Sequence, residues 1–235
     1  MAIAGGVGTM ICNATHEGDW QTVVDLANRH PRIKSYLGVH PWFADTVTAG
    51  WLQRLALLLR DGSGIGEVGL DHLVPVDRAL QEQVFLGQMD LAVRLGRPVT
   101  IHCLKAWGRM LELLQDYSAV HAGLLFHSFG GSREVMRHLL DMGAFFSFSA
   151  ALADPRRAKM RQVFMDVPLD RLLLETDAPD QYVPALFAPK QPLAAPPCNQ
   201  PCHIPTIYAF AGGLRKVDPE RFRDILWKNV KIFTD

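Results

Sequence analysis

Short apolar runs alternate with amphipathic segments along almost the whole chain, and this alternation limits the fold more than any other feature of the sequence. Most of the runs are apolar throughout, which is typical of strands buried on both faces of a parallel sheet. The predicted strands are 7–12, 36–39, 64–67, 98–102, 123–127, 144–148 and 171–175. The other segments carry apolar residues at spacings of three and four, which predicts helices that lie on a sheet. The predicted helices are 20–28, 48–59, 78–95, 107–114, 133–142, 155–164 and 219–233.

This order of elements, at about 25 to 35 residues per strand–helix unit, predicts an α/β fold that is either an open doubly wound sheet or a closed (β/α) barrel. A chain of 235 residues fits one barrel, so we expect a single domain over residues 1–235. Residues 178–205 form a long stretch without a predicted element and contain eight prolines. A stretch of this kind is more typical of a functional loop than of a linker.

The composition excludes several classes of protein. Hydrophobic residues make up 49% of the chain, which excludes disordered, collagenous and coiled-coil structures. Lys plus Arg and Asp plus Glu both number 24, so a nucleic-acid ligand would need local positive charge or metal ions. The four cysteines form no disulfide pattern, and Cys198, Cys202 and His203 offer too few donors for a zinc site. We expect a cytoplasmic protein without a membrane span.

Several predicted strands end at or just before a side chain that can bind a metal ion or move a proton. These residues are His40, Glu67, His102, His127 and Asp177. In a parallel barrel the carboxyl ends of all strands surround one opening, so residues far apart in the sequence meet there. Imidazole nitrogens and carboxylate oxygens together are ligands for Zn²⁺, Mn²⁺ or Fe, and two such ions support phosphodiester hydrolysis. For each residue alone, the alternative is a polar side chain that meets solvent at a strand end.

Segments of the chain resemble the TatD-related, metal-dependent deoxyribonucleases of the amidohydrolase-like barrels. The matching segments are GVHPW (38–42), GIGEVGLD (64–71), the helix start at 81–83, PVTIHC (98–103), HSFGGS (127–132), LLLETDAP (172–179) and the loop 199–201. The resemblance implies a TIM-type (β/α) barrel that hydrolyses phosphodiester bonds in DNA as an exonuclease. It also implies divalent metal ions as cofactors (Zn, Mn or Mg), up to two per active site.

By the same resemblance, four residues are metal ligands: Glu67, His102, His127 and Asp177. Glu67 would bridge two ions, and His102 and His127 would hold one of them. Asp177 would bind the other ion and orient or deprotonate the attacking water. Glu67 and Asp177 are therefore the expected catalytic residues.

Four further residues are candidates for substrate binding: His40, Lys105, Gly130 and Gly131. Lys105 lies close to where the family often carries arginine and would place a point charge near a phosphate; otherwise it is a solvated lysine. The glycines precede a predicted helix, whose first amides can bind phosphate, although an ordinary turn capped by Ser132 is the alternative. His40 either contacts substrate or has a structural role.

The chain departs from the family pattern in one respect. Family members open with a strand that ends in His-x-His, which supplies two ligands to one ion, and no His-x-His occurs in these 235 residues. The predicted strands are also one fewer than the eight of a closed barrel. We therefore expect a barrel without its first strand and helix, one weakened metal site, and self-association through an open sheet edge. The alternative functions are a catalytically impaired truncated barrel or another amidohydrolase-like enzyme, a deaminase or an amidase.

Overall fold

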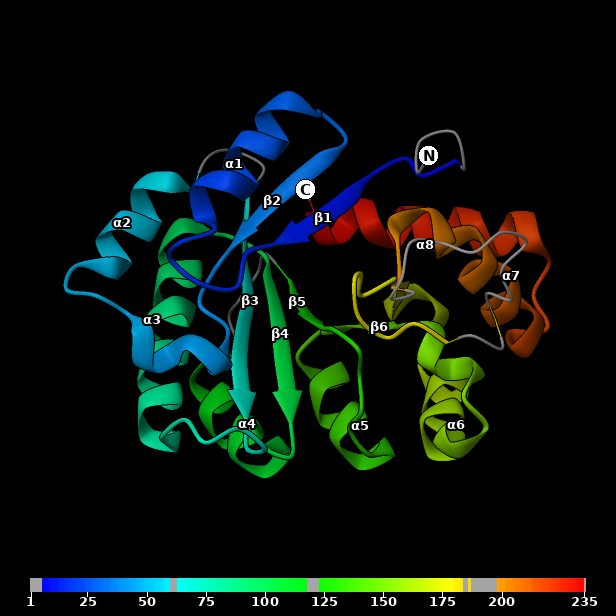
Figure 1. Ribbon diagram of the computed structural model, residues 1–235. Helices are drawn as coiled ribbons and strands as arrows, with labels where there is room; N and C mark the ends of the chain where they lie inside the picture. Colours follow the sequence, from blue (N-terminus) through cyan, green and yellow to red (C-terminus); the bar gives the residue numbers. More distant parts are fainter. Residues whose placement is uncertain (1–5, 60–62, 118–122, 184–185, 187–197, 235) are drawn as a thin grey trace. The chain divides into compact units, whose positions relative to one another are not determined.

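The structure, a computed structural model, describes residues 6–59, 63–117, 123–183, 186 and 198–234 (Figure 1). In these residues seven strands alternate with helices along the chain, as predicted. The strands are β1 (Met10–Asn13), β2 (Ile33–Leu37), β3 (Gly64–Asp71), β4 (Val99–Leu104), β5 (Leu124–Phe126), β6 (Phe145–Phe148) and β7 (Leu172–Leu174). The α-helices are α1 (Trp20–Arg29), α2 (Trp51–Leu58), α3 (Arg78–Leu95), α4 (Trp107–Leu114), α5 (Arg133–Asp141), α6 (Ala158–Asp166), α7 (Ile204–Arg215) and α8 (Pro219–Thr234).

The chain divides into two compact units. The N-terminal unit comprises residues 9–126, 137–145 and 233–235. The C-terminal unit comprises residues 1–8, 127–136 and 146–232. Strands β1 to β5 lie in the N-terminal unit, whereas β7 and all but the first residue of β6 lie in the C-terminal unit. The single domain over residues 1–235 stays a prediction.

Within the N-terminal unit, β1 to β5 pair in parallel and in chain order. Most side chains of β3 and all those of β5 are buried, which accounts for their continuous apolar pattern. The register between β3 and β4 shifts between Ile65 and Val68, next to Glu67. Such an irregularity bends a strand and changes the direction of its side chains, so it helps to set the position of Glu67. In the C-terminal unit β6 pairs in parallel with β7.

Helix α3 covers β3 and has clear sequence signals at both ends (Figure 1). Asp77 caps its start, because Asp77 Oδ1 accepts a hydrogen bond from the Leu80 amide at 2.9 Å. Gly96 ends it in the left-handed conformation, with a φ of +60°, which glycine adopts without strain. These signals explain why the predicted bounds, 78–95, agree with the observed helix.

Other bounds differ from the prediction. Strand β2 begins at Ile33 rather than at 36, because its first two residues are only half-buried and do not extend the apolar run. The predicted helix 155–164 is a 3₁₀ turn, Pro155–Arg157, followed by α6.

Helix α7 was not predicted, and residues up to 205 were expected to be irregular. Pro205 lies in the first turn of α7, where proline is tolerated, so the proline does not exclude a helix. His203 is likewise not in an irregular loop but in the 3₁₀ helix Pro201–His203 directly before α7. Residues 187–197 of the predicted irregular stretch lie outside the described residues.

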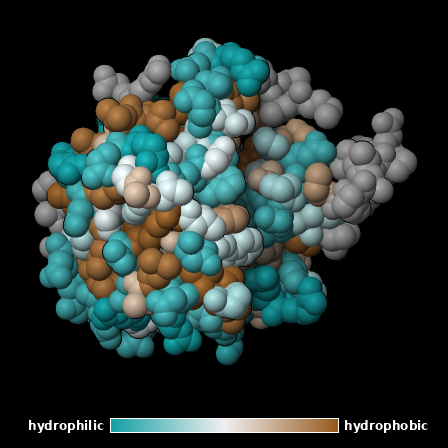
Figure 2. Space-filling view, turned by 60° about the vertical axis from the view of Figure 1, so that its left-hand side comes forward, coloured by the Kyte–Doolittle hydropathy of each residue, from teal (hydrophilic) through white to brown (hydrophobic). Residues whose placement is uncertain are grey.

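The surface mixes apolar and polar side chains, as Figure 2 shows for one face. In the part of the chain that the structure describes, the exposed large apolar side chains are Trp42, Leu57, Leu73, Val93, Leu95, Leu104, Met165, Trp227 and Ile232. Among the described residues, none of the helices combines the length and the apolar character needed to cross a membrane.

Gly69 is a position in β3 that only glycine fits. Its φ is +144°, and a Cβ atom there would lie 1.9 Å from the His102 carbonyl oxygen. We predict that Gly69→Ala lowers the free energy of unfolding by about 3 kcal/mol or more, because backbone strain and a clash with the backbone of β4 act together. The matched control is Gly96→Ala, which has a φ of +60° and no atom within 4 Å of the added Cβ. The control should lose only about 1 kcal/mol. Urea denaturation measures both variants, and equal losses would contradict the account.

Candidate functional site

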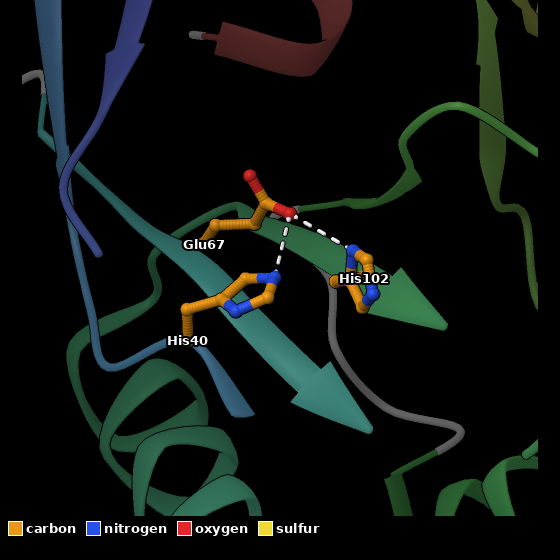
Figure 3. A group of neighbouring side chains, drawn as sticks. All are labelled: His40, Glu67 and His102. Carbon is orange, nitrogen blue, oxygen red and sulfur yellow. Dashed lines mark hydrogen bonds and ion pairs between the residues drawn. The ribbon is translucent and has the colours of Figure 1, made fainter. Parts of the chain in front are cut away.

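Three potential metal ligands lie together in the N-terminal unit: His40, Glu67 and His102 (Figure 3). His40 follows β2, Glu67 lies in β3 and His102 lies in β4, so neighbouring strands supply all three. Glu67 Oε1 lies 3.4 Å from His40 Nε2 and 3.1 Å from His102 Nδ1. The side chains of Glu67 and His102 are 14% and 16% exposed, and that of His40 is 7% exposed. One ligand atom of each residue lies within 4.8 Å of the others, close enough to share one metal ion.

Local hydrogen bonds orient the two imidazoles. His40 precedes the 3₁₀ helix Pro41–Thr46, and its Nδ1 accepts a hydrogen bond from the Trp42 amide at 3.2 Å. Because Nδ1 accepts, the neutral ring carries its proton on Nε2, which faces Glu67. The Nε2 of His102 lies 3.4 Å from Asp71 Oδ2. A carboxylate on the far nitrogen is a common way for proteins to orient a metal-binding histidine.

Asp71, the carboxylate behind His102, is 1% exposed. Its Oδ2 accepts a hydrogen bond from Trp42 Nε1 at 2.7 Å, and its Oδ1 accepts one from the Leu73 amide at 2.8 Å. Burial raises the pKa of Asp71, but the hydrogen bonds from His102, Trp42 and Leu73 outweigh burial and lower it to about 2. Asp71 is therefore ionised at neutral pH.

Two buried glutamines of α3 form hydrogen bonds to the backbone near the ends of β2 and β3. Gln88 Oε1 accepts a hydrogen bond from the Val39 amide at 2.7 Å, and Gln88 Nε2 donates to the Val39 carbonyl at 3.3 Å. Gln81 binds the backbone of Asp71 in the same way, at 2.8 and 2.9 Å. The chain is thus fixed directly before His40 and at Asp71.

A second group of potential ligands lies in the C-terminal unit: His127, Glu175 and Asp177. His127 follows β5 in the sequence, and the two acidic residues follow β7. His127 Nδ1 lies 4.0 Å from Glu175 Oε2 and 3.8 Å from Asp177 Oδ1. Ser147 Oγ donates a hydrogen bond to Glu175 Oε2 at 2.5 Å. One ligand atom of each of the three lies within 4.8 Å of the others.

Gln181 fixes the orientation of the Asp177 carboxylate. Its Nε2 donates to Asp177 Oδ2 and to Ser128 Oγ, both at 2.5 Å, and its Oε1 accepts a hydrogen bond from Ser149 Oγ. Ser149 Oγ accepts from the Ala151 amide at 3.1 Å, so its own proton is available to Gln181. The amide therefore has one orientation, with its NH₂ group toward Asp177 Oδ2, while Asp177 Oδ1 faces His127.

The backbone around Asp177 is held by Asn199, which is 2% exposed. The Asn199 amide donates to the Pro179 carbonyl at 2.9 Å, and Asn199 Nδ2 donates to the Thr176 carbonyl. His203 Nδ1 lies 2.9 Å from Asn199 Oδ1. Within the described part of the chain, His203 and the two nearby cysteines belong to neither group of potential ligands.

The other residues predicted to bind substrate lie in turns. Lys105 is exposed and follows β4, with a φ of +56°. Gly130 is exposed, whereas Gly131 is buried and a Cβ there would lie 2.5 Å from a phenylalanine ring. Ser132 Oγ accepts a hydrogen bond from the amide three residues later at 3.2 Å, so the helix-capping role is present. Phosphate binding by these residues stays a prediction.

The sequence analysis did not single out Glu175 or Gln181. Glu175 ends the predicted strand 171–175, the same positional signal that identified Glu67. Gln181 carries no such signal, because it reaches Asp177 only through a turn in which both residues have a positive φ. His40 was predicted to bind substrate, and the structure places its Nε2 against Glu67.

Comparison with known proteins agrees with these features. The family model described as TatD related DNase matches residues 2–234. The chain is 33% identical to the 3′-5′ ssDNA/RNA exonuclease TatD of Citrobacter koseri, over 98% of this chain and 88% of that protein. It is 34% identical to the protein of the same name from Erwinia billingiae, over 92% of this chain and 83% of the relative.

Solved structures show the same fold. The TatD homolog YJJV from Escherichia coli superimposes with a TM-score of 0.87 at 25% identity, covering 99% of this chain and 88% of the other. A TatD family hydrolase from Entamoeba histolytica superimposes with a TM-score of 0.85 at 20% identity, covering 99% and 86%. The TIM-type fold class predicted from the sequence is confirmed.

These matches define a metal-dependent hydrolase of the nuclease class. The chain belongs to the TatD-related DNase family, and the prediction of a TatD-type enzyme that cleaves phosphodiester bonds is confirmed at this level. The two groups described above fit such an enzyme, because each brings imidazole and carboxylate donors within the reach of one cation.

The network around Gln181 generates a prediction about stability. We expect Gln181→Ala to lower the free energy of unfolding by about 1–3 kcal/mol, because it removes hydrogen-bond partners from partly buried groups. The control is Gln21→Ala, since Gln21 Nε2 also donates to an aspartate, Asp25 Oδ1, but on the exposed face of α1. That variant should change stability by less than about 0.5 kcal/mol. Thermal denaturation distinguishes the two, and a loss in both variants alike would show that the network does not stabilise the fold.

Proposed function

We propose that this protein is a metal-dependent exonuclease that degrades single-stranded DNA or RNA from the 3′ end. The observation that carries the proposal is the largely buried Glu67 carboxylate, which lies between the imidazoles of His40 and His102. The names of the relatives from Citrobacter koseri and Erwinia billingiae support the substrate and the polarity.

Each group of potential ligands would hold one divalent cation. The predicted ligands Glu67 and His102 would act with His40, and the predicted ligands His127 and Asp177 would act with Glu175. Two imidazoles and one carboxylate suit Zn²⁺, whereas one imidazole and two carboxylates also suit Mn²⁺ or Mg²⁺. We therefore expect the two groups to differ in affinity. When bound, such ions polarise a phosphodiester and favour the deprotonation of water.

The two catalytic carboxylates of the proposal are Glu67 and Asp177. Gln181 Nε2 donates a hydrogen bond to Asp177 Oδ2. Asp177 Oδ1, which faces His127, is therefore the oxygen that would bind an ion or accept a proton from the attacking water. Glu67 Oε1 would bind the same cation as the imidazoles of His40 and His102.

Phosphate groups of the substrate would meet the turns that follow β4 and β5. Lys105 would offer a point charge, and Gly130 and Gly131 would offer backbone amides. We also infer that the protein acts in the cytoplasm, which its cysteine pattern supports. Self-association through a sheet edge stays a prediction, which analytical ultracentrifugation tests.

Removal of the Glu67 charge tests the proposed metal site. We expect the Glu67→Gln variant to lose the metal ion of the first group. Its activity on a single-stranded oligonucleotide should fall at least about 100-fold, because removal of a group that only orients a metal ligand already lowers metal affinity or activity by about 10- to 100-fold. The control is Glu112→Gln on α4, whose side chain is 63% exposed and pairs with Arg109. Metal content by elemental analysis and initial rates check both variants. Full metal content in the Glu67 variant would place the metal elsewhere.

The polarity of degradation provides a separate test. With a 5′-labelled single-stranded oligonucleotide and Mn²⁺, we expect progressively shortened labelled products. With a 3′-label, we expect the label to be released first as a mononucleotide. Treatment with a chelator should abolish both results, and added Mn²⁺ should restore them. Shortening from the 5′ end, or deaminase or amidase activity without nuclease activity, would contradict the proposal.

A further inference from the structure

Three exposed apolar residues adjoin Asp71, the carboxylate behind the potential ligand His102. Trp42, Leu73 and Leu104 are 51%, 64% and 38% exposed. All three adjoin Asp71. Trp42 Nε1 and the Leu73 amide donate hydrogen bonds to its carboxylate, and Leu104 is its register partner in β4. We call these three residues the apolar rim.

Trp42 is anchored by its polar edge while much of its surface is open. Its Nε1 donates to the buried Asp71 carboxylate at 2.7 Å, and its ring lies 4.9 Å from the His40 ring, at 85° to it. The only polar atom of the indole is therefore already bonded, so the exposed remainder is an aromatic surface. Trp20 differs, because it is 2% exposed and belongs to the core.

We propose that Trp42 is a stacking platform for a nucleobase of the substrate, with Leu73 and Leu104 as the apolar edge of this subsite. The proposal rests on the proposed nuclease function and names how that site holds its substrate. Every nucleobase has an aromatic face, so a tryptophan platform binds single strands without regard to sequence.

The net charge of the chain is consistent with a contribution of base stacking to substrate affinity. The formal net charge is zero, so general attraction for a polyanion is weak. Stacking supplies affinity that does not depend on charge. Lys105 directly follows Leu104 and is exposed, which places a positive charge beside the apolar rim for the adjoining phosphate.

Trp42 has two contacts that an experiment must separate. Its ring would stack on a base, whereas its N–H holds Asp71, which in turn lies 3.4 Å from His102. Trp42→Phe keeps an aromatic ring and loses the N–H. Trp42→Ala loses both, and Trp42→Leu retains apolar volume without a ring.

The test compares two single-stranded oligonucleotides of equal length, one with bases and one abasic throughout. KM and kcat are measured for both with Mn²⁺, and binding is measured by fluorescence anisotropy. In Trp42→Ala we expect the preference for the base-containing strand, expressed as the ratio of the two KM values, to fall at least about 5-fold. Trp42→Phe should retain most of the preference. The control is Trp227→Ala on α8, a tryptophan that is 44% exposed and outside the rim, and it should keep the full preference.

Each outcome has one meaning. An unchanged preference in Trp42→Ala overturns the stacking proposal, as does an equal loss of binding to both strands, which would mean that Trp42 acts only through Asp71. If Trp42→Ala does not fold, Trp42→Leu replaces it with the same expected loss. If the unmodified protein hydrolyses neither strand, the proposed function itself fails.

Discussion

The candidate site depends on a charge that the fold has largely removed from water, the carboxylate of Glu67. It is 14% exposed and lies within 3.4 Å of one imidazole and 3.1 Å of another. A buried carboxylate is costly unless a positive charge or hydrogen-bond donors balance it. Here the balancing groups are nitrogens that also bind metals, so a divalent cation can take the place of the protons that face Glu67 if the His40 ring proton moves to Nδ1. The donors around Glu67 in this chain therefore fit the metal dependence of the family.

Side-chain amides hold both groups of potential ligands in place. Gln88 and Gln81 each bind one backbone N–H and C=O of the chain segments next to His40 and at Asp71. In the other unit, Gln181 binds the carboxylate of Asp177 directly. An amide has both a donor and an acceptor, so it can fix a partner without adding charge to the site. Such hydrogen bonds position the side chains before an ion binds, so less conformational freedom is lost on binding.

The sequence predicted the parts of the fold and site that depend on local pattern. Apolar runs predicted all seven described strands. Strand ends predicted Glu67, His102 and His127 as candidate ligands, and the structure places each of them in one of the two groups. The partners of these residues depend on contacts distant in the sequence, such as the approach of His40 to Glu67, and no periodicity encodes them. Glu175 ends a predicted strand, but its approach to His127 is a contact between residues distant in the sequence, which the strand pattern does not encode. Helix α7 was missed because Pro205 is a helix breaker in most positions but not in a first turn.

The central claim is that Glu67, His40 and His102 bind one divalent cation. A crystal structure of the zinc-loaded protein, with anomalous data collected on both sides of the zinc absorption edge, tests it most directly. We expect an anomalous peak about 2.0–2.2 Å from Glu67 Oε1 and from the facing nitrogens of the two histidines. A fully occupied zinc peak elsewhere, with these three side chains still in contact with one another, would contradict the account.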